Sequence, residues 1–379
     1  MNLLKAAAAS GKRARGSGGA EDVVFPEKFY DSSFLSSWNS GSPPTTYVEG
    51  PPWGFSGNFP FVRSGILAAD GRVIYFGNPD KVAEIYDPVT DNHTTQTTNH
   101  TPNGIIEMVY YTEFGNAIIS FRNSDDIFRY DIMTDTYTNI ISPSGQRPGV
   151  ISLTGEIILF TIFWPGKLVH YNPATDTSKT VTISKRVYVA GVLAPSGDII
   201  IVNTNSDIDT YNPVTETFTS AVTTHPEGND AFNGGLVLPT GKILLLPDQS
   251  SYIGLFDPAT NTYTRGPLLT GFIGTGRFTD AVLTPSGSVI MISEEHGETV
   301  GLYDPFTDTY SEFSIATSTG SGQISQGPFR GCVLTLSGDV VLLPRTSPNV
   351  GILTGGTPIP NGTNYAPTGV FVNNTFKNQ

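Results

Sequence analysis

The sequence predicts an all-β fold, a seven-bladed β-propeller of four-stranded antiparallel blades. A tight-turn glycine between two apolar runs recurs at intervals of roughly 40 to 50 residues, the length of one such blade. A Tyr-Asp-Pro-like segment follows the glycine turn in most units, and no long stretch has helical periodicity. The turn glycines are Gly71, Gly115, Gly155, Gly197, Gly241, Gly287 and Gly338.

The first hairpin of each unit is an apolar strand, a tight turn ending in glycine and a second apolar strand, as in residues 191–202. The second hairpin is clearest at residues 255–263, where Asp257 can cap the following backbone N–H groups and Pro258 presets φ in the turn. The Thr and aromatic residues that follow favour a strand. Related copies begin at Tyr86, Tyr130, Tyr171, Tyr211 and Tyr303.

The two ends of the repeat region complement each other. The last unit has no Asp-Pro turn after residues 350–353, so its fourth strand is missing. Residues 46–51 repeat the pattern of residues 262–267, which predicts that an N-terminal strand completes the last blade and removes an open sheet edge. We therefore divide the chain into an extension (1–42), the propeller (43–354) and a C-terminal tail (355–379).

These repeats resemble the kelch-like repeats of β-propellers, including the propeller of the galactose oxidase family. The resemblance covers roughly residues 43–354 and implies the fold rather than an activity, because propellers serve as enzymes, lectins, scaffolds and virion parts. The usual Gly-Gly pair after the second strand is absent, and Tyr or Phe replaces the usual Trp of the fourth strand.

Composition limits the partners. The formal net charge of −13 argues against nucleic-acid or anionic-membrane binding by the propeller body, since both need a basic surface. No apolar run has the length of a membrane span, and no convincing secretory segment begins the chain. The single cysteine, Cys332, cannot form an intramolecular disulfide, so cysteine usage does not indicate whether the protein works in an oxidising or a reducing compartment.

The first twenty residues carry only positive charges, at Lys5, Lys12, Arg13 and Arg15. They form either a disordered tail or an arm that becomes ordered on a partner surface. Their charge suits an acidic surface on a neighbouring subunit.

Short turns are expected at one end of the disc, which we call the turn face. The opposite end, the loop face, carries the variable loops, where function on a rigid scaffold usually lies. Phe163 and Trp164 lie in one of these loops and are candidates for partner binding, the alternative being that they pack on an adjacent loop.

Arginines recur before the innermost strands, near the mouth of the central channel. They either bind an anion or an acidic partner, or pair with acidic and carbonyl groups between blades. The candidates are Arg63, Arg147, Arg277 and Arg330.

The sequence indicates no catalytic site, cofactor or metal site. The five histidines lack metal-ligand spacing, and we expect surface or turn roles for them. Cys332 is expected to be a buried thiol rather than part of a copper-radical site, and the acidic turns to cap backbone rather than bind calcium. The histidines are His93, His100, His170, His225 and His296.

Two classes of function remain. The first is a non-enzymatic interaction protein of a large assembly, such as a phage capsid or tail, in which the propeller is the scaffold and the arm the anchor. The second is a carbohydrate-binding propeller, lectin-like or receptor-binding, or a carbohydrate-active enzyme, for which Trp53 and Trp164 would offer stacking faces. The corresponding partners are other subunits, or a glycan or host-surface receptor.

Overall fold

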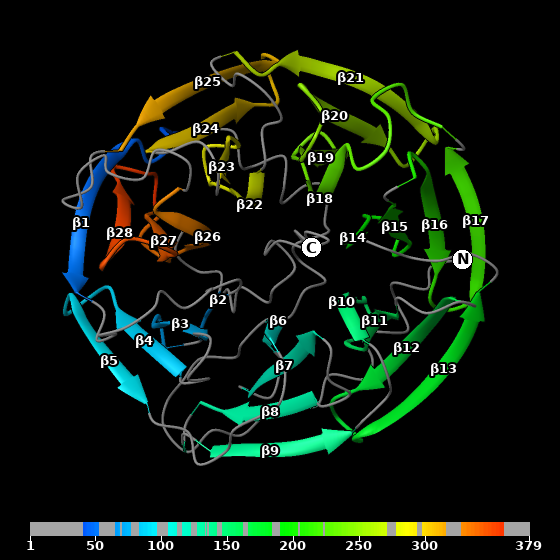
Figure 1. Ribbon diagram of the computed structural model, residues 1–379, viewed down its shortest axis with the longest axis horizontal. Coiled ribbons are helices and arrows are strands. Elements are labelled where there is room, and N and C mark those ends of the chain that lie inside the picture. The colour runs from blue at the N-terminus through cyan, green and yellow to red at the C-terminus, as the bar shows by residue number, and fades with distance from the viewer. Residues whose placement is uncertain are drawn as a thin grey trace.

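The computed structural model is a ring of seven four-stranded antiparallel sheets around a central axis, the predicted seven-bladed β-propeller (Figure 1). The described part of the chain contains strands and no helix. In each blade the first strand lies nearest the axis and the fourth forms the rim (Figure 1). The structure describes residues 41–52, 65–68, 70–76, 83–96, 105–111, 116–122, 127–132, 134, 136–141, 146–161, 166–183, 190–203, 205–222, 224–270, 278–293, 298–315 and 327–359.

The strands follow the sequence order within each blade. Blade 1 contains β2 (Gly65–Leu67), β3 (Val73–Phe76), β4 (Ala83–Asp87) and β5 (Asn92–Gln96); blade 2 contains β6 (Ile105–Tyr111), β7 (Asn116–Arg122), β8 (Ile127–Asp131) and β9 (Thr136–Ile141). Blade 3 contains β10 (Gln146–Ile151), β11 (Ile157–Thr161), β12 (Gly166–Asn172) and β13 (Thr177–Ile183); blade 4 contains β14 (Ala190–Leu193), β15 (Ile199–Val202), β16 (Ile208–Asn212) and β17 (Thr217–Val222).

The remaining blades include the exception to this order. Blade 5 contains β18 (Phe232–Val237), β19 (Ile243–Pro247), β20 (Tyr252–Asp257) and β21 (Thr262–Leu268); blade 6 contains β22 (Phe278–Leu283), β23 (Val289–Ser293), β24 (Thr299–Asp304) and β25 (Thr309–Ser314). Blade 7 contains β26 (Phe329–Leu334), β27 (Val340–Pro344), β28 (Asn349–Thr354) and, at the rim, β1 (Thr46–Pro52).

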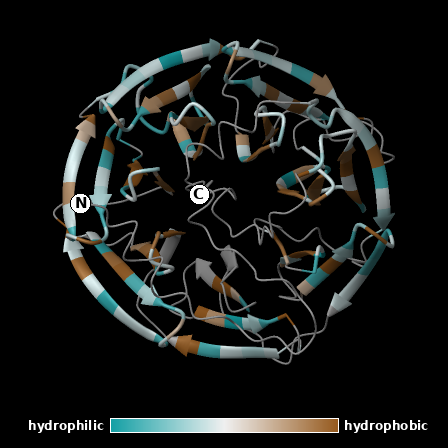
Figure 2. Ribbon diagram, turned by 180° about the vertical axis from the view of Figure 1, so that it is seen from behind, coloured by the Kyte–Doolittle hydropathy of each residue, from teal (hydrophilic) through white to brown (hydrophobic). Residues whose placement is uncertain are grey.

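Burial explains why the inner strands read as continuous apolar runs. Both faces of a blade pack against neighbouring blades near the axis, so β14 and β15 are buried at every position. The rim strand β17 instead mixes exposed and half-buried positions. Figure 2 shows the same contrast, with hydrophobic colour on inner strands and mixed colour around the rim.

The turn chemistry inferred from the sequence is present on the turn face. Gly197 has φ of 90°, a left-handed conformation that a side chain disfavours, and similar values occur at the other described turn glycines. In the second hairpin the Asp257 carboxylate accepts a hydrogen bond from the Ala259 N–H at 2.9 Å. Asp87, Asn172, Asn212 and Asp304 cap their turns in the same way.

The two ends of the described chain meet on blade 7. β1 pairs antiparallel with β28, with Tyr47 opposite Leu353 and Glu49 opposite Gly351. On the turn face the Ser42 N–H donates to Thr357 Oγ1 at 3.0 Å. The chain thus enters and leaves the ring on the turn face, while the extension and tail (1–42 and 355–379) stay predicted divisions.

A Phe-Gly-Tyr arrangement that the sequence analysis missed recurs in blades 5 to 7. A Phe at the start of the inner strand packs over a glycine of the third strand, where a Cβ on Gly351 would lie 2.5 Å from Cζ of Phe329. The missing side chain lets the Phe ring approach a rim tyrosine, 6.2 Å from Phe329 to Tyr47 between centroids. The other sets are Phe232, Gly254 and Tyr263, and Phe278, Gly301 and Tyr310.

Candidate functional site on the loop face

The structure describes few of the residues singled out for partner binding. Arg330 lies on β26 with only 7% of its surface exposed, which favours the alternative in which it pairs within the fold. Arg147 lies on β10, described by its backbone alone. Outside the described residues are Phe163, Trp164, Arg63, Arg277, Lys5, Lys12, Arg13 and Arg15, whose roles stay predictions.

The expectation of surface or turn roles is wrong for the three histidines that the structure describes. His170 and His225 are buried, and the His93 side chain is 3% exposed. Each ring meets a polar or aromatic partner inside the fold, which offsets the cost of burial. The His93 Nε2, for example, lies 3.0 Å from Glu84 Oε2 and 2.9 Å from the Tyr75 hydroxyl.

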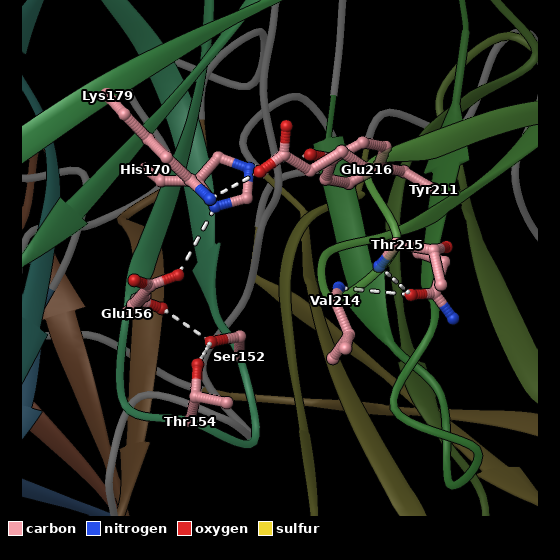
Figure 3. A network of polar contacts seen from close by, with 10 residues as sticks. Ser152, Thr154, Glu156, His170, Lys179, Tyr211, Val214, Thr215 and Glu216 are labelled. Carbon is pink, nitrogen blue, oxygen red and sulfur yellow. Dashed lines mark hydrogen bonds and ion pairs between the residues drawn. The ribbon is translucent and has the colours of Figure 1, made fainter.

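A chain of polar contacts on the turn face joins blade 3 to blade 4 (Figure 3). His170 Nε2 lies 2.6 Å from the Tyr211 hydroxyl, and Nδ1 lies 3.2 Å from Glu156 Oε2. A carboxylate only accepts, so we assign the Nδ1 proton to the Glu156 bond and let Tyr211 donate to Nε2. Burial lowers the pKa of His170, which favours this neutral form of the ring.

Neighbouring contacts extend the same junction. The Lys179 ammonium pairs with the Glu216 carboxylate of blade 4 (Figure 3). One blade earlier, the Arg129 guanidinium donates to the Tyr171 hydroxyl at 3.3 Å and also pairs with Asp176. We call the contacts between blades 3 and 4, which include His170 and Tyr211, and those between blades 2 and 3 the inter-blade latches.

The Glu156-His170-Tyr211 chain contains the groups of an acid-base relay, but only its outer member, the Glu156 carboxylate, reaches solvent, with 28% of the side chain exposed. Tyr211 is fully buried and His170 is 1% exposed. A general base must come within hydrogen-bond distance of the proton that it removes from a substrate. The described geometry therefore gives these groups a structural role, holding blade 3 against blade 4.

The loop face carries an ordered connection between blades 4 and 5, residues 224–231, which we call the blade 4–5 platform. On one side the His225 N–H donates to the Ser206 carbonyl at 3.0 Å. On the other side the Ala231 carbonyl accepts from the Asp248 N–H at 2.8 Å. Because loops of both blades hold it, the platform presents fixed side chains.

Glu227 of the platform organises a polar cluster at the edge of blade 5. Its side chain is 5% exposed, and Oε1 accepts from Arg265 Nε at 2.8 Å and from the Tyr263 hydroxyl at 3.1 Å. The Arg265 guanidinium also lies over the Tyr252 ring, 4.3 Å from its centroid. The Arg265 side chain is nevertheless 45% exposed.

The His225 ring packs against the Tyr263 ring of this cluster. Its ring stacks on Tyr263, with centroids 5.3 Å apart, and meets Phe232 edge-on at 5.1 Å. Burial lowers the pKa of His225, so the ring is neutral near pH 7. A neutral aromatic support holds the Tyr263 hydroxyl toward Glu227, and thus fixes the anchor of Arg265.

Sequence reasoning indicated this face, and the connection 265–280 on it, but did not single out these side chains. Arg265 occupies a rim position held by Thr95, Ser220 and Glu312 in other blades, so its departure from the repeat was a usable signal. Glu227 gave no signal, because it lies in a connection without a repeat counterpart.

The described residues offer little for metal, thiol or membrane chemistry. They contain no cluster of three or more His, Cys, Asp or Glu side chains placed to hold a metal ion. Cys332 is buried, and burial raises the pKa of its thiol well above the usual range. Among the same residues no helix is long and apolar enough to cross a membrane.

Comparison with known proteins identifies the fold class. No family model and no curated protein sequence matches the chain. A streptogramin B lyase structure is similar, with a TM-score of 0.67 and 13% identity over 81% of this chain and 97% of that one. A catalytically inactive virginiamycin B lyase from Staphylococcus aureus, with quinupristin, has a TM-score of 0.65 and 10% identity over 82% and 99%.

A WD40 domain is similar to a comparable extent. The WD40 β-propeller domain of Doa1 has a TM-score of 0.60 and 13% identity, covering 82% of this chain and 97% of that chain. At such identities the likeness shows the propeller fold alone, and the kelch-like resemblance stays a prediction.

Proposed function

We propose that the chain is a non-enzymatic interaction module of a large assembly, and that it binds a protein partner with the loop face of its propeller. The observation that carries the proposal is Arg265, whose guanidinium is fixed by Glu227 and Tyr252 while nearly half of the side chain stays in water. Arg129 on the turn face differs from Arg265: its side chain is only 25% exposed, and its guanidinium is paired with groups of the next blade.

The physical reason lies in the cost of ordering a side chain on binding. Arginine and tyrosine are enriched among residues that dominate protein interfaces. A mobile arginine side chain loses rotamer entropy when a partner binds. Arg265 loses less, because Glu227 already holds its Nε and its guanidinium lies over the Tyr252 ring. A planar guanidinium fixed in this way suits a carboxylate or carbonyl group of a partner protein.

The setting that we propose for the assembly is a virion, such as a phage capsid or tail. Its support is compositional: the body is acidic and rich in Thr, Asn and Gly, and the first twenty residues are wholly basic. Fold alone does not decide between this function and catalysis, since the similar structures include both lyases and a WD40 domain.

The experiment compares Arg265→Gln with Arg72→Gln, which makes the same charge change on the turn face. Arg72 also has a carboxylate partner, Asp70 at 2.8 Å. In cells that produce the assembly, Arg265→Gln should lower incorporation of the chain about tenfold, a loss of roughly 1.4 kcal/mol. Arg72→Gln should incorporate normally, and both should melt close to wild type. Normal incorporation of Arg265→Gln, or equal losses, would contradict the proposal.

A further inference from the structure

A groove of about 650 Å³ lies on the turn face between blade 6 and the first described residues of the chain. One wall includes Leu302 on β24 and Phe306 in the following turn. The other includes Gly41 and Pro43, just before β1. The volume is within the usual range of small-molecule binding sites.

The groove lies where the repeat pattern is interrupted. At the junction of blades 3 and 4, His170 and Lys179 lie opposite each other on β12 and β13 and contact residues of blade 4. The corresponding opposed pair on blade 6 is Leu302 and Ser311, which has no charged group and forms no such latch. Blade 7 also has no hairpin after β28, because β1 supplies its fourth strand.

Most of the groove lining is polar, and several of its oxygen atoms are available to a ligand. Asp304 Oδ1 accepts from the Phe306 N–H at 2.8 Å, whereas Oδ2 accepts no hydrogen bond from the described residues. The Ser288 and Ser311 hydroxyl groups also have no hydrogen-bond partner in the described part of the chain. A carboxylate accepts hydrogen bonds, and a hydroxyl both donates and accepts, so these groups match a ligand with several hydroxyl groups.

Phe306 adds an apolar surface to this polar lining. The residue is 48% exposed. The face of its ring carries partial negative charge, which attracts the C–H groups on one face of a sugar ring. Four other blades have a smaller side chain at the same turn position, so the aromatic ring is not a general feature of the repeat. These smaller residues are Val89, Ala174, Val214 and Ala259.

We propose that this groove binds a neutral pyranose sugar. None of the described lining residues is basic, and Asp304 carries a negative charge, so an anionic ligand is disfavoured. A wholly apolar ligand would remove the carboxylate and the serine hydroxyls from water without replacing their hydrogen bonds. A pyranose matches both parts of the lining, with hydroxyl groups toward Asp304, Ser288 and Ser311 and a C–H face against Phe306.

This inference goes beyond the proposed function and does not rest on it. The groove lies on the turn face, whereas Arg265 and its anchor Glu227 lie on the loop face. The groove residues also differ from Trp53 and Trp164, the stacking candidates indicated by the sequence. Because the two faces are at opposite ends of the disc, one chain has room for a protein partner and a sugar at the same time.

The test is saturation-transfer-difference NMR of the full chain with galactose, glucose, mannose and N-acetylglucosamine, and with N-acetylneuraminate as an anionic comparison. We expect a neutral sugar to bind with a millimolar dissociation constant, since a ligand of this size makes few contacts. Phe306→Ala should weaken binding about tenfold, because the ring face is lost. Alanine occupies this turn position in blades 3 and 5, so the hairpin should still fold. Val214→Ala, at the same position of blade 4, should leave binding unchanged.

A second pair of variants tests the carboxylate. Asp304→Asn removes the charge but keeps the turn cap, because Asn172 and Asn212 cap the corresponding turns of blades 3 and 4. The variant should weaken sugar binding about tenfold, since a hydrogen bond to an ionised acceptor is replaced by a neutral one. Asp257→Asn makes the same change in the turn of blade 5 and should bind the sugar like the wild type.

The outcomes separate this groove from other sites. Circular dichroism and melting temperature establish that each variant is folded. The proposal is overturned if no neutral sugar of the panel binds at about 50 mM, or if binding is unchanged in both Phe306→Ala and Asp304→Asn. Binding that depends on Trp53 or Trp164 instead would place the sugar elsewhere on the chain and would also overturn it. Preferential binding of N-acetylneuraminate would contradict the neutral ligand class.

Discussion

Removal of one hydroxyl group should loosen the junction between blades 3 and 4. Tyr211→Phe keeps the buried ring but leaves the His170 Nε2 without the donor that now lies 2.6 Å away. Both side chains are buried, so water cannot readily replace the lost hydrogen bond. A buried polar group left unsatisfied costs about 1–3 kcal/mol, and we expect a loss of about 2 kcal/mol in the free energy of unfolding.

The chain provides a matched control. Tyr303 is an equally buried tyrosine of blade 6, but its hydroxyl donates to the exposed carboxylate of Asp308 at 3.0 Å. After Tyr303→Phe, water can solvate that carboxylate, so the loss should be about 1 kcal/mol or less. Urea unfolding of both variants at pH 7.5 gives the comparison. Equal losses in the two variants would refute the assignment of His170 and Tyr211 as an inter-blade latch.

Three further predictions concern acid stability, ring closure and the loop face. Burial lowers the pKa of His225 below its usual value of 6.5, so the unfolded chain binds a proton at a higher pH than the folded chain does. The free energy of unfolding should therefore fall as the pH drops below about 6.5. His225→Gln should flatten that fall, as measured by urea titrations from pH 8 to pH 5. Deletion of residues 1–50 removes most of β1 and should lower the melting temperature strongly, whereas deletion of 1–20 should not, and equal melting would contradict the closure. Serine at Phe163 and Trp164 should weaken partner association with little change in melting temperature, and a large thermal loss with intact binding would show a structural role.

Sequence reasoning predicted the fold because each blade repeats its own chemistry. The Gly197 turn and the Asp257 cap are local features, set by φ preferences and short hydrogen bonds, and they recur in nearly every blade. The missing hairpin after β28 could be recognised for the same reason, as a departure from a regular pattern. The number of blades followed from the spacing of the turn glycines alone.

Contacts between blades were beyond the same reasoning. His170 and Tyr211 are 41 residues apart, and only the stacking of the blades brings the ring and the hydroxyl together. The platform residue Glu227 meets Arg265 in the same long-range way, from a connection with no repeat counterpart. Side-chain partners across blades depend on how neighbouring blades are placed against each other in the propeller. Patterns in a single sequence predict the fold class but not this placement.

The most direct test of the central claim is the native mass of the particle that contains this chain. Mass photometry of gently extracted material, followed by identification of the co-purifying subunits, measures it without assuming a partner. We predict a multi-subunit particle many times heavier than the 40.6 kDa chain, from which Arg265→Gln is depleted. A monomer of about 40 kDa at native concentration, free of other subunits, would contradict the assembly function.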